Sequence, residues 1–408
     1  MLLLSYLPWL LGYLDNIMNI KNINLTTISN SSITILYPFE YDKDKVLRID
    51  TKKIVKLKNE TLKDFLPYTK NFFGTYHFEE NKPSNIIFPM VYANDKITSI
   101  DFIKDKKIID TISLSDTCIY FFEKSIAILA VRYDIPENLS NEDFLYYHQK
   151  LSMIEKRSKQ NIITSTKNEY KYYYEFIDSL VAPYTNNTAN IFSRSNLYTY
   201  NLLVANTNEK DNNTQSFIEP LLQYRNTLDT ISINQTDISY IQQVSNIHTF
   251  ANENVVAHIG IRKENSNNNF INNEFFNKYQ NNHFLTYLIT LYQTCKIEQL
   301  IIKAFLEEDA DKDLKNIREI KSEILHFIAN GDFTKISNNS IRNNLYKFYR
   351  NNFEIKNMLN EIQTISDKLS NELETIIQDK KATSDEKRNL FIGIIGVVLA
   401  VIQIYQAF

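Results

Sequence analysis

Apolar residues recur in alternating steps of four and three along the last part of the chain. The steps start at Ile341 and reach, in order, Leu345, Phe348, Asn352, Ile355, Leu359, Ile362, Ser366, Leu369, Leu373 and Ile376. Nine of these eleven positions are apolar, which is the a/d pattern of a coiled coil. A helix with this seam must bury it against preceding helices, other copies of the chain, or both. The alternative is a long helix packed within its own domain.

The sequence carries no charged residue after Arg388. The 19 residues of Leu390–Phe408 would form about 28 Å of helix, close to the roughly 30 Å hydrocarbon thickness of a bilayer. We therefore predict one C-terminal transmembrane helix. Lys387 and Arg388 precede it and favour a cytoplasmic N-terminal domain. The expected location is thus the inner membrane of the cell, crossed once.

Small and polar residues in this segment indicate where neighbouring helices or a pore would lie. Gly396 and Ala400 are four residues apart on one face, and together with Gly393 they would let helices approach closely. The alternative is that membrane helices contain small residues in any case. Gln403 and Gln406 are near the far end, where they line a pore mouth or lie at the membrane interface.

The preceding two thirds of the chain predict an α/β domain. Between residues 33 and 134, short β-branched and aromatic runs are separated by Asp, Lys, Asn or Pro clusters, which is typical of strands. The run SIAILAVRYDI (125–135) is apolar on both faces at its centre and predicts a central strand. Helices are expected over about 141–157 and 169–181, and a last strand over 253–263.

These patterns divide the chain into three parts. Residues 1–265 form the cytosolic α/β domain, 274–389 a helical stalk with coiled-coil character, and 390–408 the transmembrane helix. A polar, Asn-rich linker separates the first two parts. The predicted fold class is therefore α+β: an α/β domain with a mixed sheet, then a long helical stalk and one C-terminal transmembrane helix.

The composition argues against several classes of function. The formal net charge of −3 argues against direct nucleic-acid binding by bulk electrostatics. The six glycines are scattered, so there is no Gly-rich phosphate loop. With no metal-binding pattern and no nucleophile–base constellation, we expect no enzyme, no metal and no cofactor. Cys118 and Cys295 are interpreted as reduced core thiols. His248 and His258 flank one predicted strand, where a surface or satisfied core role is favoured.

A small anionic ligand such as a nucleotide would need arginines beside aromatic rings. Three pairs of neighbouring residues offer this combination, and the alternative for each is ordinary packing or surface exposure. The candidate ligand-binding residues are Arg132 with Tyr133 at a strand end, Phe192 with Arg194 in a polar loop, and Tyr224 with Arg225 at a helix end.

The layout of Ile341–Phe408 resembles the CorA-like divalent-cation channel family. In that family a cytosolic α/β domain precedes long helices, the last of which continues into the first membrane helix as a pentameric stalk. That membrane helix ends in a Tyr-Gly-Met-Asn signature, where this chain reads Ile-Tyr-Gln-Ala-Phe over 404–408. Tyr405 corresponds to the tyrosine, but the Gly, Met, Asn and second membrane helix have no counterpart. The resemblance implies a homo-oligomer, a pentamer, and does not carry over magnesium transport.

The resemblance also implies a function, because divergent CorA-like proteins occur as membrane effectors of bacterial antiviral systems, some of them activated by nucleotide second messengers. We expect an oligomeric membrane effector or channel in which a cytosolic sensor is coupled through the stalk to the lipid bilayer. A small nucleotide is the expected ligand. The alternatives are a CorA-like ion transporter represented without its second membrane helix and a non-conducting, membrane-anchored interaction protein.

Overall fold

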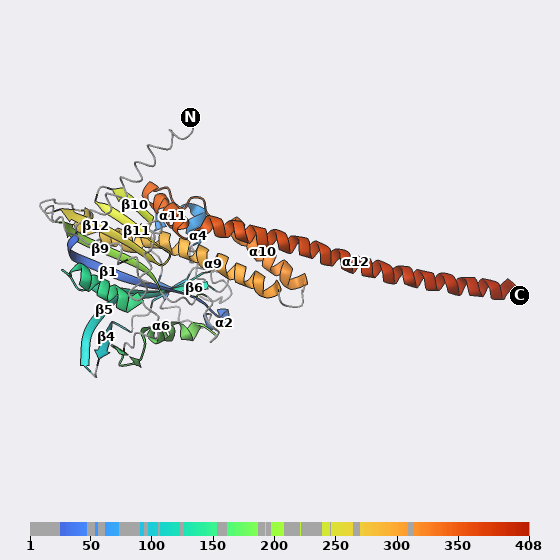
Figure 1. Cartoon of the computed structure of the whole chain (residues 1–408), viewed down its shortest axis with the longest axis horizontal. Helices are drawn as coiled ribbons and strands as arrows, with labels where there is room; N and C mark the ends of the chain where they lie inside the picture. The colour runs from blue at the N-terminus through green and yellow to red at the C-terminus, as the bar shows by residue number, and fades with distance from the viewer. Residues whose placement is uncertain are drawn as a thin grey trace, which may run out of the picture. The chain divides into compact units, whose positions relative to one another are not determined.

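A computed structural model gives the fold of the chain (Figure 1). The chain divides into two compact units: a sheet unit of Met1–Cys295 and Thr334–Glu354, and a helical unit of Lys296–Phe333 and Ile355–Phe408. The residues that the structure describes are 25–46, 54–55, 62–72, 90–93, 97–104, 107–122, 126–152, 161–186, 192, 197–207, 221, 239–244, 246–263, 270–308 and 314–407, with the side chains of the last range described as far as 395.

One mixed sheet forms the base of the sheet unit. The strand order is β10-β11-β12-β9-β1-β6-β5-β4-β7-β8, while β3 pairs with β5 and β2 with β3. The β12–β9 pair is parallel, and the other described pairs are antiparallel. The strands are β1 Leu25–Glu40, β2 Ile54–Val55, β3 Met90–Ala93, β4 Ser99–Lys104, β5 Lys107–Phe121, β6 Ile126–Ile135, β7 Asn161–Thr164, β8 Glu169–Tyr170, β9 Tyr198–Thr207, β10 Ser239–Val244, β11 Ile247–Ala251 and β12 Val255–Lys263.

Strand β6 lies between β1 and β5, so the prediction of a central strand is confirmed. Its first six residues are all buried, on both faces of the sheet. A strand covered on both sides needs a nearly continuous apolar run of this kind. The predicted last strand is also confirmed, as β12.

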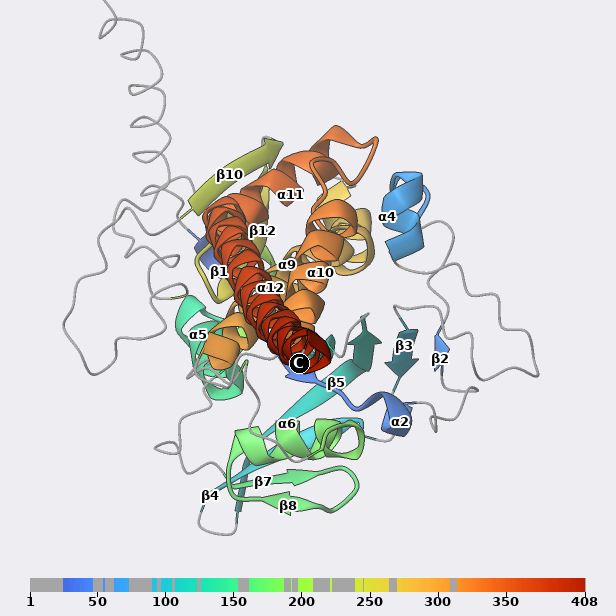
Figure 2. The same ribbon diagram turned by 90° about the vertical axis from the view of Figure 1, so that its right-hand side faces the viewer.

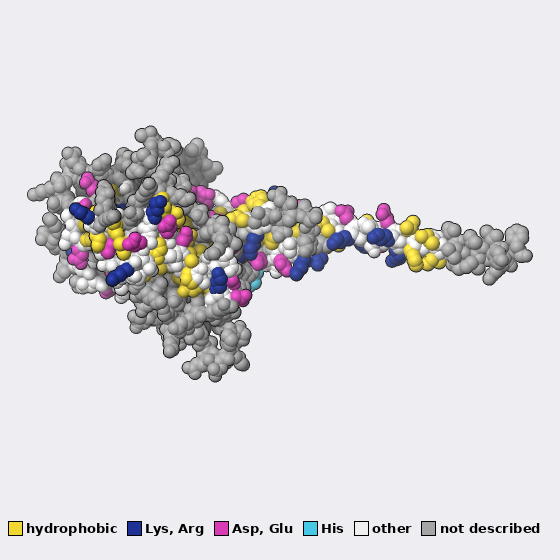
Figure 3. Space-filling model, turned by 90° about the horizontal axis from the view of Figure 1, so that it is seen from below, with side chains coloured by type: hydrophobic (Ala, Val, Ile, Leu, Met, Phe, Trp, Pro, Cys, Tyr) yellow, Lys and Arg dark blue, Asp and Glu magenta, His cyan; other side chains and the backbone are white. Residues whose placement is uncertain are grey.

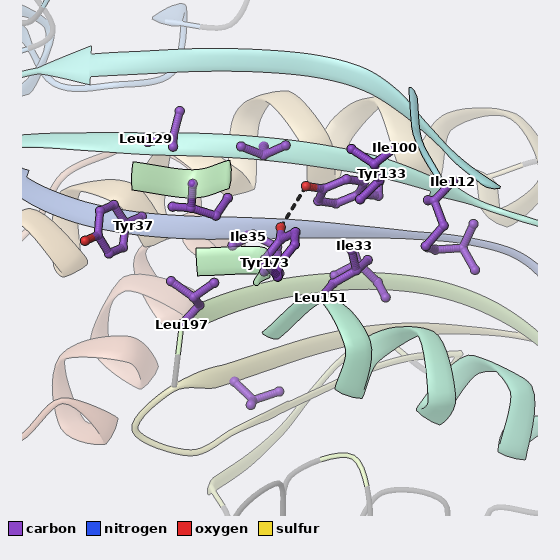
Figure 4. Packing of buried hydrophobic residues seen from close by; sticks show 14 of the residues in the cluster. Ile33, Ile35, Tyr37, Ile100, Ile112, Leu129, Tyr133, Leu151, Tyr173 and Leu197 are labelled. Atoms are coloured by element: carbon purple, nitrogen blue, oxygen red, sulfur yellow. Dashed lines mark hydrogen bonds between the residues drawn. The ribbon is translucent and has the colours of Figure 1, made fainter. Parts of the chain in front are cut away.

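The main hydrophobic core lies on one face of the sheet, against α5 (Asn141–Ser152) and α6 (Tyr173–Val181). Figure 4 shows part of it, including Ile33 and Ile35 of β1 and Leu151 of α5. The hydroxyl of Tyr133 lies 2.7 Å from that of Tyr173 within this core. Full burial of one Leu or Ile side chain contributes about 1.5–3 kcal/mol, so this face stabilises much of the unit.

Of the two helices predicted after β6, the first begins at the predicted residue and the second does not. Helix α5 begins where expected, because Ser140 Oγ accepts a hydrogen bond from the Asp143 backbone and caps the helix. The second helix begins later than predicted, because Glu169–Tyr170 pairs with β7 as β8. The remaining helical elements are α2 Lys43–Val46, α4 Pro67–Phe72, η2 Ala182–Tyr184, η4 Phe270–Glu274, α8 Phe275–Lys278, η5 Tyr279–His283, α9 Phe284–Glu308, α10 Leu314–Asn330, α11 Ser340–Asn352 and α12 Ile355–Ala407.

In the helical unit, α10 packs against the first part of α12, and Figures 1 and 2 both show the two helices side by side. Helix α10 buries Ile317, Ile320 and Ile324, which recur at helical spacing. The a/d seam of α12 is buried at Ile362 and Leu369. Part of the predicted seam is therefore covered within the protomer.

The seam does not run through a single helix from Ile341. Helix α11 ends at Asn352, and Phe353 and Glu354 form a turn before α12 begins. Glu354 has a φ of 51°, in the left-handed region that interrupts a right-handed helix. Helix α11 consequently belongs to the sheet unit and α12 to the helical unit.

The prediction of a transmembrane helix over 390–408 was wrong. Within the part of the chain that the structure describes, no helix is long and apolar enough to cross a bilayer. A span needs about 20 predominantly apolar residues. The fold class with a membrane helix and the single-pass location in the inner membrane are wrong for the same reason, and a membrane or channel assignment conflicts with this finding.

Candidate functional site

The sheet separates the two members of the first candidate pair, Arg132 and Tyr133. Successive side chains of a strand point to opposite faces. Tyr133 is fully buried in the main core, bonded to Tyr173. Arg132 points to the other face, where its guanidinium carbon lies 5.9 Å from the centre of the Phe284 ring at the start of α9. The pair therefore cannot act together on one ligand.

Arg132 contacts protein groups on this second face. Its Nη2 donates to the backbone carbonyl of Gln280 at 3.3 Å, and its Nη1 lies 3.9 Å from a carboxylate oxygen of Asp116. The Gln280 side chain in turn donates to the hydroxyl of Ser32 at 3.4 Å. These contacts tie the π-helical turn before α9 to the middle of the sheet. The prediction of a ligand at Arg132 stays a prediction.

Cys118 lies next to this group and is buried with a free thiol, as expected for a core cysteine. Its Sγ donates to Asp116 at 3.1 Å. Burial, followed by the negative charge of Asp116, raises the pKa of the thiol far above its usual range. The thiolate is the reactive form of cysteine, so this thiol is a poor nucleophile at neutral pH.

A buried polar network surrounds His258 on the same face. Its Nδ1 lies 2.7 Å from the Thr249 hydroxyl on β11, and its Nε2 lies 2.9 Å from the Tyr349 hydroxyl on α11. The Tyr200 hydroxyl donates to the carbonyl of Tyr279 at 2.9 Å nearby. Burial holds the pKa of His258 well below its usual range. The imidazole is therefore neutral and structural, which agrees with the interpretation of a satisfied core histidine.

Of the other candidate ligand-binding residues, one lies in the part of the chain that the structure describes. Phe192 is buried, with 4% of its surface exposed. Arg194, Tyr224 and Arg225 lie outside the described residues. Among the residues that are described, no group of three or more His, Cys, Asp or Glu side chains is arranged to hold a metal ion.

The end of α12 presents apolar side chains on its surface. Leu390, Phe391, Ile392, Ile394 and Ile395 are between 43% and 68% exposed. Figure 3 shows them as a yellow band beside the grey end of the helix. Exposed apolar clusters are typical of surfaces that contact another molecule.

The small and polar residues predicted to pack against helices or line a pore lie within and after this cluster. Gly393 faces open space, because a Cβ atom added there would meet nothing within 4 Å. Gly396, Ala400, Gln403 and Gln406 lie on the helical backbone of α12, and their side chains are outside the described part. Their role in helix packing stays a prediction.

Comparisons with known proteins give no family for this chain. No protein-family model, no curated protein and no solved structure matches it. The resemblance to CorA-like proteins therefore stays a prediction, and function has to be argued from the site itself.

Two buried residues of α11, Tyr349 and Arg342, were missed from the sequence. Tyr349 bonds with His258, 91 residues earlier. Arg342 lies next to Ile341, the first position of the seam, and is 2% exposed. Neither has a local sequence signal, because the partner of each comes from a segment far away in the chain.

Proposed function

We propose that this chain is a self-assembling effector, in which copies associate through α12 and the sheet unit of each copy serves as the sensor. Self-association and sensing were both expected from the sequence, and neither requires a membrane segment. An antiviral role and a nucleotide trigger stay predictions.

The observation that supports self-assembly is the position of Leu390 and Ile394 on α12. They follow Leu369 and Leu373 by three heptads each, so they occupy the same seam. Leu369 and Leu373 are 4% and 8% exposed, whereas Leu390 and Ile394 are 68% and 55% exposed. The seam that is buried near α10 is polar at Lys380, Thr383 and Lys387, and it becomes apolar again, and exposed, at Leu390 and Ile394.

The length of α12 explains why the stripe is exposed. With 53 residues it extends about 80 Å, against about 25 Å for the 17 residues of α10. Every side chain from Ile377 to Ile395 is exposed. An isolated helix is only marginally stable in water, whereas burying one Leu or Ile contributes about 1.5–3 kcal/mol. Association with other helices would therefore stabilise this half of α12.

The polar residues between the two apolar parts suit a specific bundle. Lys380 and Lys387 occupy seam positions, and Asp379 and Glu386 directly precede them. A lysine in the seam restricts register and the number of helices, at a cost in stability. Acidic residues beside the seam can pair with lysines of a neighbouring helix. A bundle of identical helices would satisfy both requirements.

The experiment is a comparison of two double variants of the full chain. Leu390→Lys with Ile394→Lys places charges in the seam, whereas Ile392→Lys with Ile395→Lys places the same charges outside it. Sedimentation velocity should show a multiple of the 48.0 kDa chain mass for the unchanged protein and the second variant. The first variant should shift towards the monomer. A monomeric unchanged protein, or equal behaviour of both variants, contradicts the proposal and favours a partner of different sequence for α12.

A further inference from the structure

The sheet unit contains a buried guanidinium that lacks hydrogen-bond acceptors. Arg342, in the first turn of α11, is 2% exposed. Its Nε and Nη1 have no hydrogen-bond partner among the described residues. Buried charged groups in proteins are normally paired and fully hydrogen-bonded. This arginine therefore lacks acceptors for two of its nitrogens among the described residues.

Its surroundings offer only weak compensation for the charge. The guanidinium carbon lies 4.3 Å from the centre of the Phe65 ring. The closest carboxylate, Asp64 Oδ2, lies 3.8 Å from Nη2, which is too long for a hydrogen bond, and its side chain is 44% exposed. The imidazole of His283 lies within electrostatic reach, and burial, followed by the charge of Arg342, lowers its pKa to about 3. A neutral imidazole does not balance the arginine.

Hydrogen bonds fix the backbone on both sides of the guanidinium. Asn339 caps α11 by accepting a hydrogen bond from the Arg342 backbone N–H at 3.2 Å. The segment that carries Asp64 and Phe65 is fixed to the chain before α11: the carbonyl of Asp64 accepts from the Asn338 backbone at 2.9 Å and from the Ser337 hydroxyl at 2.6 Å. The first turn of α11 and the segment that carries Asp64 and Phe65 are therefore joined beside the guanidinium.

The position of Arg342 on its helix increases the need for an anionic partner. The N-terminal turn of a helix carries partial positive charge, so it favours anions and disfavours a cation. Here a second positive charge is buried in that turn. The Thr69 hydroxyl on α4 is also fully buried and without a hydrogen-bond partner in the described structure. It lies four residues after Phe65 in the sequence.

We propose that Arg342 anchors a binding site for a phosphate group, either free or carried by a nucleotide. The planar fork of an arginine matches two oxygens of a phosphate along one of two edges, Nε with Nη2 or Nη1 with Nη2. Both edges include Nη2, which faces Asp64 at 3.8 Å, so each combines one unpartnered nitrogen with the nitrogen that Asp64 approaches. Asp64 is the exposed rim of the site and competes with the ligand for the guanidinium. This proposal does not depend on whether copies of α12 associate.

The test measures binding of inorganic phosphate and of ADP to the full chain by titration calorimetry, with chloride at equal ionic strength as the reference. We expect saturable binding of one or both, and the pair of measurements separates a free anion from a nucleotide. Arg342→Gln should weaken binding at least tenfold. Arg350→Gln, on the same helix but paired with the Tyr346 hydroxyl at 3.0 Å, should leave it unchanged.

A second variant keeps the proposal testable if Arg342→Gln fails to fold. Asp64→Asn removes the competing carboxylate and should tighten phosphate binding several-fold. If the arginine is only structural, the same substitution removes its ion pair and binding does not respond. The absence of binding to the unchanged protein, or unchanged affinity in Asp64→Asn, would overturn the proposal.

Discussion

The hydroxyl of Tyr349 lies 2.9 Å from Nε2 of His258 and joins α11 to strand β12. Both groups are fully buried. Although α11 carries the first part of the coiled-coil pattern, this bond shows that it is a core helix of the sheet unit. The part of the pattern that is available to other copies therefore begins with α12.

Tyr349→Phe should lower the free energy of unfolding of the sheet unit by about 1–3 kcal/mol, because the buried His258 Nε2 loses its partner. Tyr146, which is 48% exposed, offers a matched control: Tyr146→Phe should change stability by less than about 0.5 kcal/mol. Urea unfolding followed by circular dichroism measures both. Equal effects of the two substitutions would contradict the structural role of the bond.

Stability should fall as the solution is acidified. Burial lowers the pKa of His148 and His283 to about 3 and that of His248 to about 4. Below the ordinary value near 6.5, the unfolded chain binds protons that the folded chain does not, so the free energy of unfolding decreases. Above 6.5 these histidines contribute no pH dependence. Each one contributes at most about 1.4 kcal/mol per pH unit.

Urea unfolding at intervals between pH 8 and pH 4.5 tests this prediction. The slope should be small above pH 6.5 and increase below it. A flat profile between pH 7 and pH 5 is incompatible with neutral, buried histidines.

Glu354→Gly should stabilise the junction between α11 and α12 by about 0.5–1 kcal/mol, since glycine adopts the left-handed conformation at φ 51° without steric cost. Glu361 is an exposed residue inside α12, where the same change should destabilise by about 1 kcal/mol. Thermal unfolding of the two variants checks the opposite signs. Destabilisation by both would mean that the turn at Glu354 carries no strain.

The two tyrosines joined in Figure 4 allow a double-substitution test of the main core. Tyr133→Phe alone should cost about 1–3 kcal/mol, because it removes one partner of a buried hydrogen bond. Adding Tyr173→Phe should cost less than the sum of the two single changes. Strict additivity in urea unfolding would show that the two hydroxyls do not interact.

Local patterns predicted local structure well. The apolar run of β6 and the start of α5 at Asn141 depend on neighbouring residues, and both were correct. The interruption of the seam at Glu354 could not be predicted, because a non-glycine residue with positive φ leaves the heptad spacing unchanged. The transmembrane prediction was wrong, because no helix in the described part of the chain is long and apolar enough to cross a bilayer.

Contacts between distant segments limited the prediction of a site. Arg132 and Tyr133 were paired as neighbours, yet the strand directs them to opposite faces. Arg342 and Asp64 are far apart in the sequence and come together only through the backbone bonds beside Ser337. The Phe65 ring that covers Arg342 is distant from it in the sequence, so pairs of adjacent arginine and aromatic residues do not include this contact.

The central claim is that α12 of one copy lies against α12 of another, and a single spin label at residue 394 tests it most directly. An Ile394→Cys chain carrying one label gives a dipolar signal only when labels of different copies approach. We predict a defined, short distance that disappears when Leu390→Lys is added. A full chain that shows no dipolar signal at any concentration, before or after that substitution, would contradict self-assembly through α12.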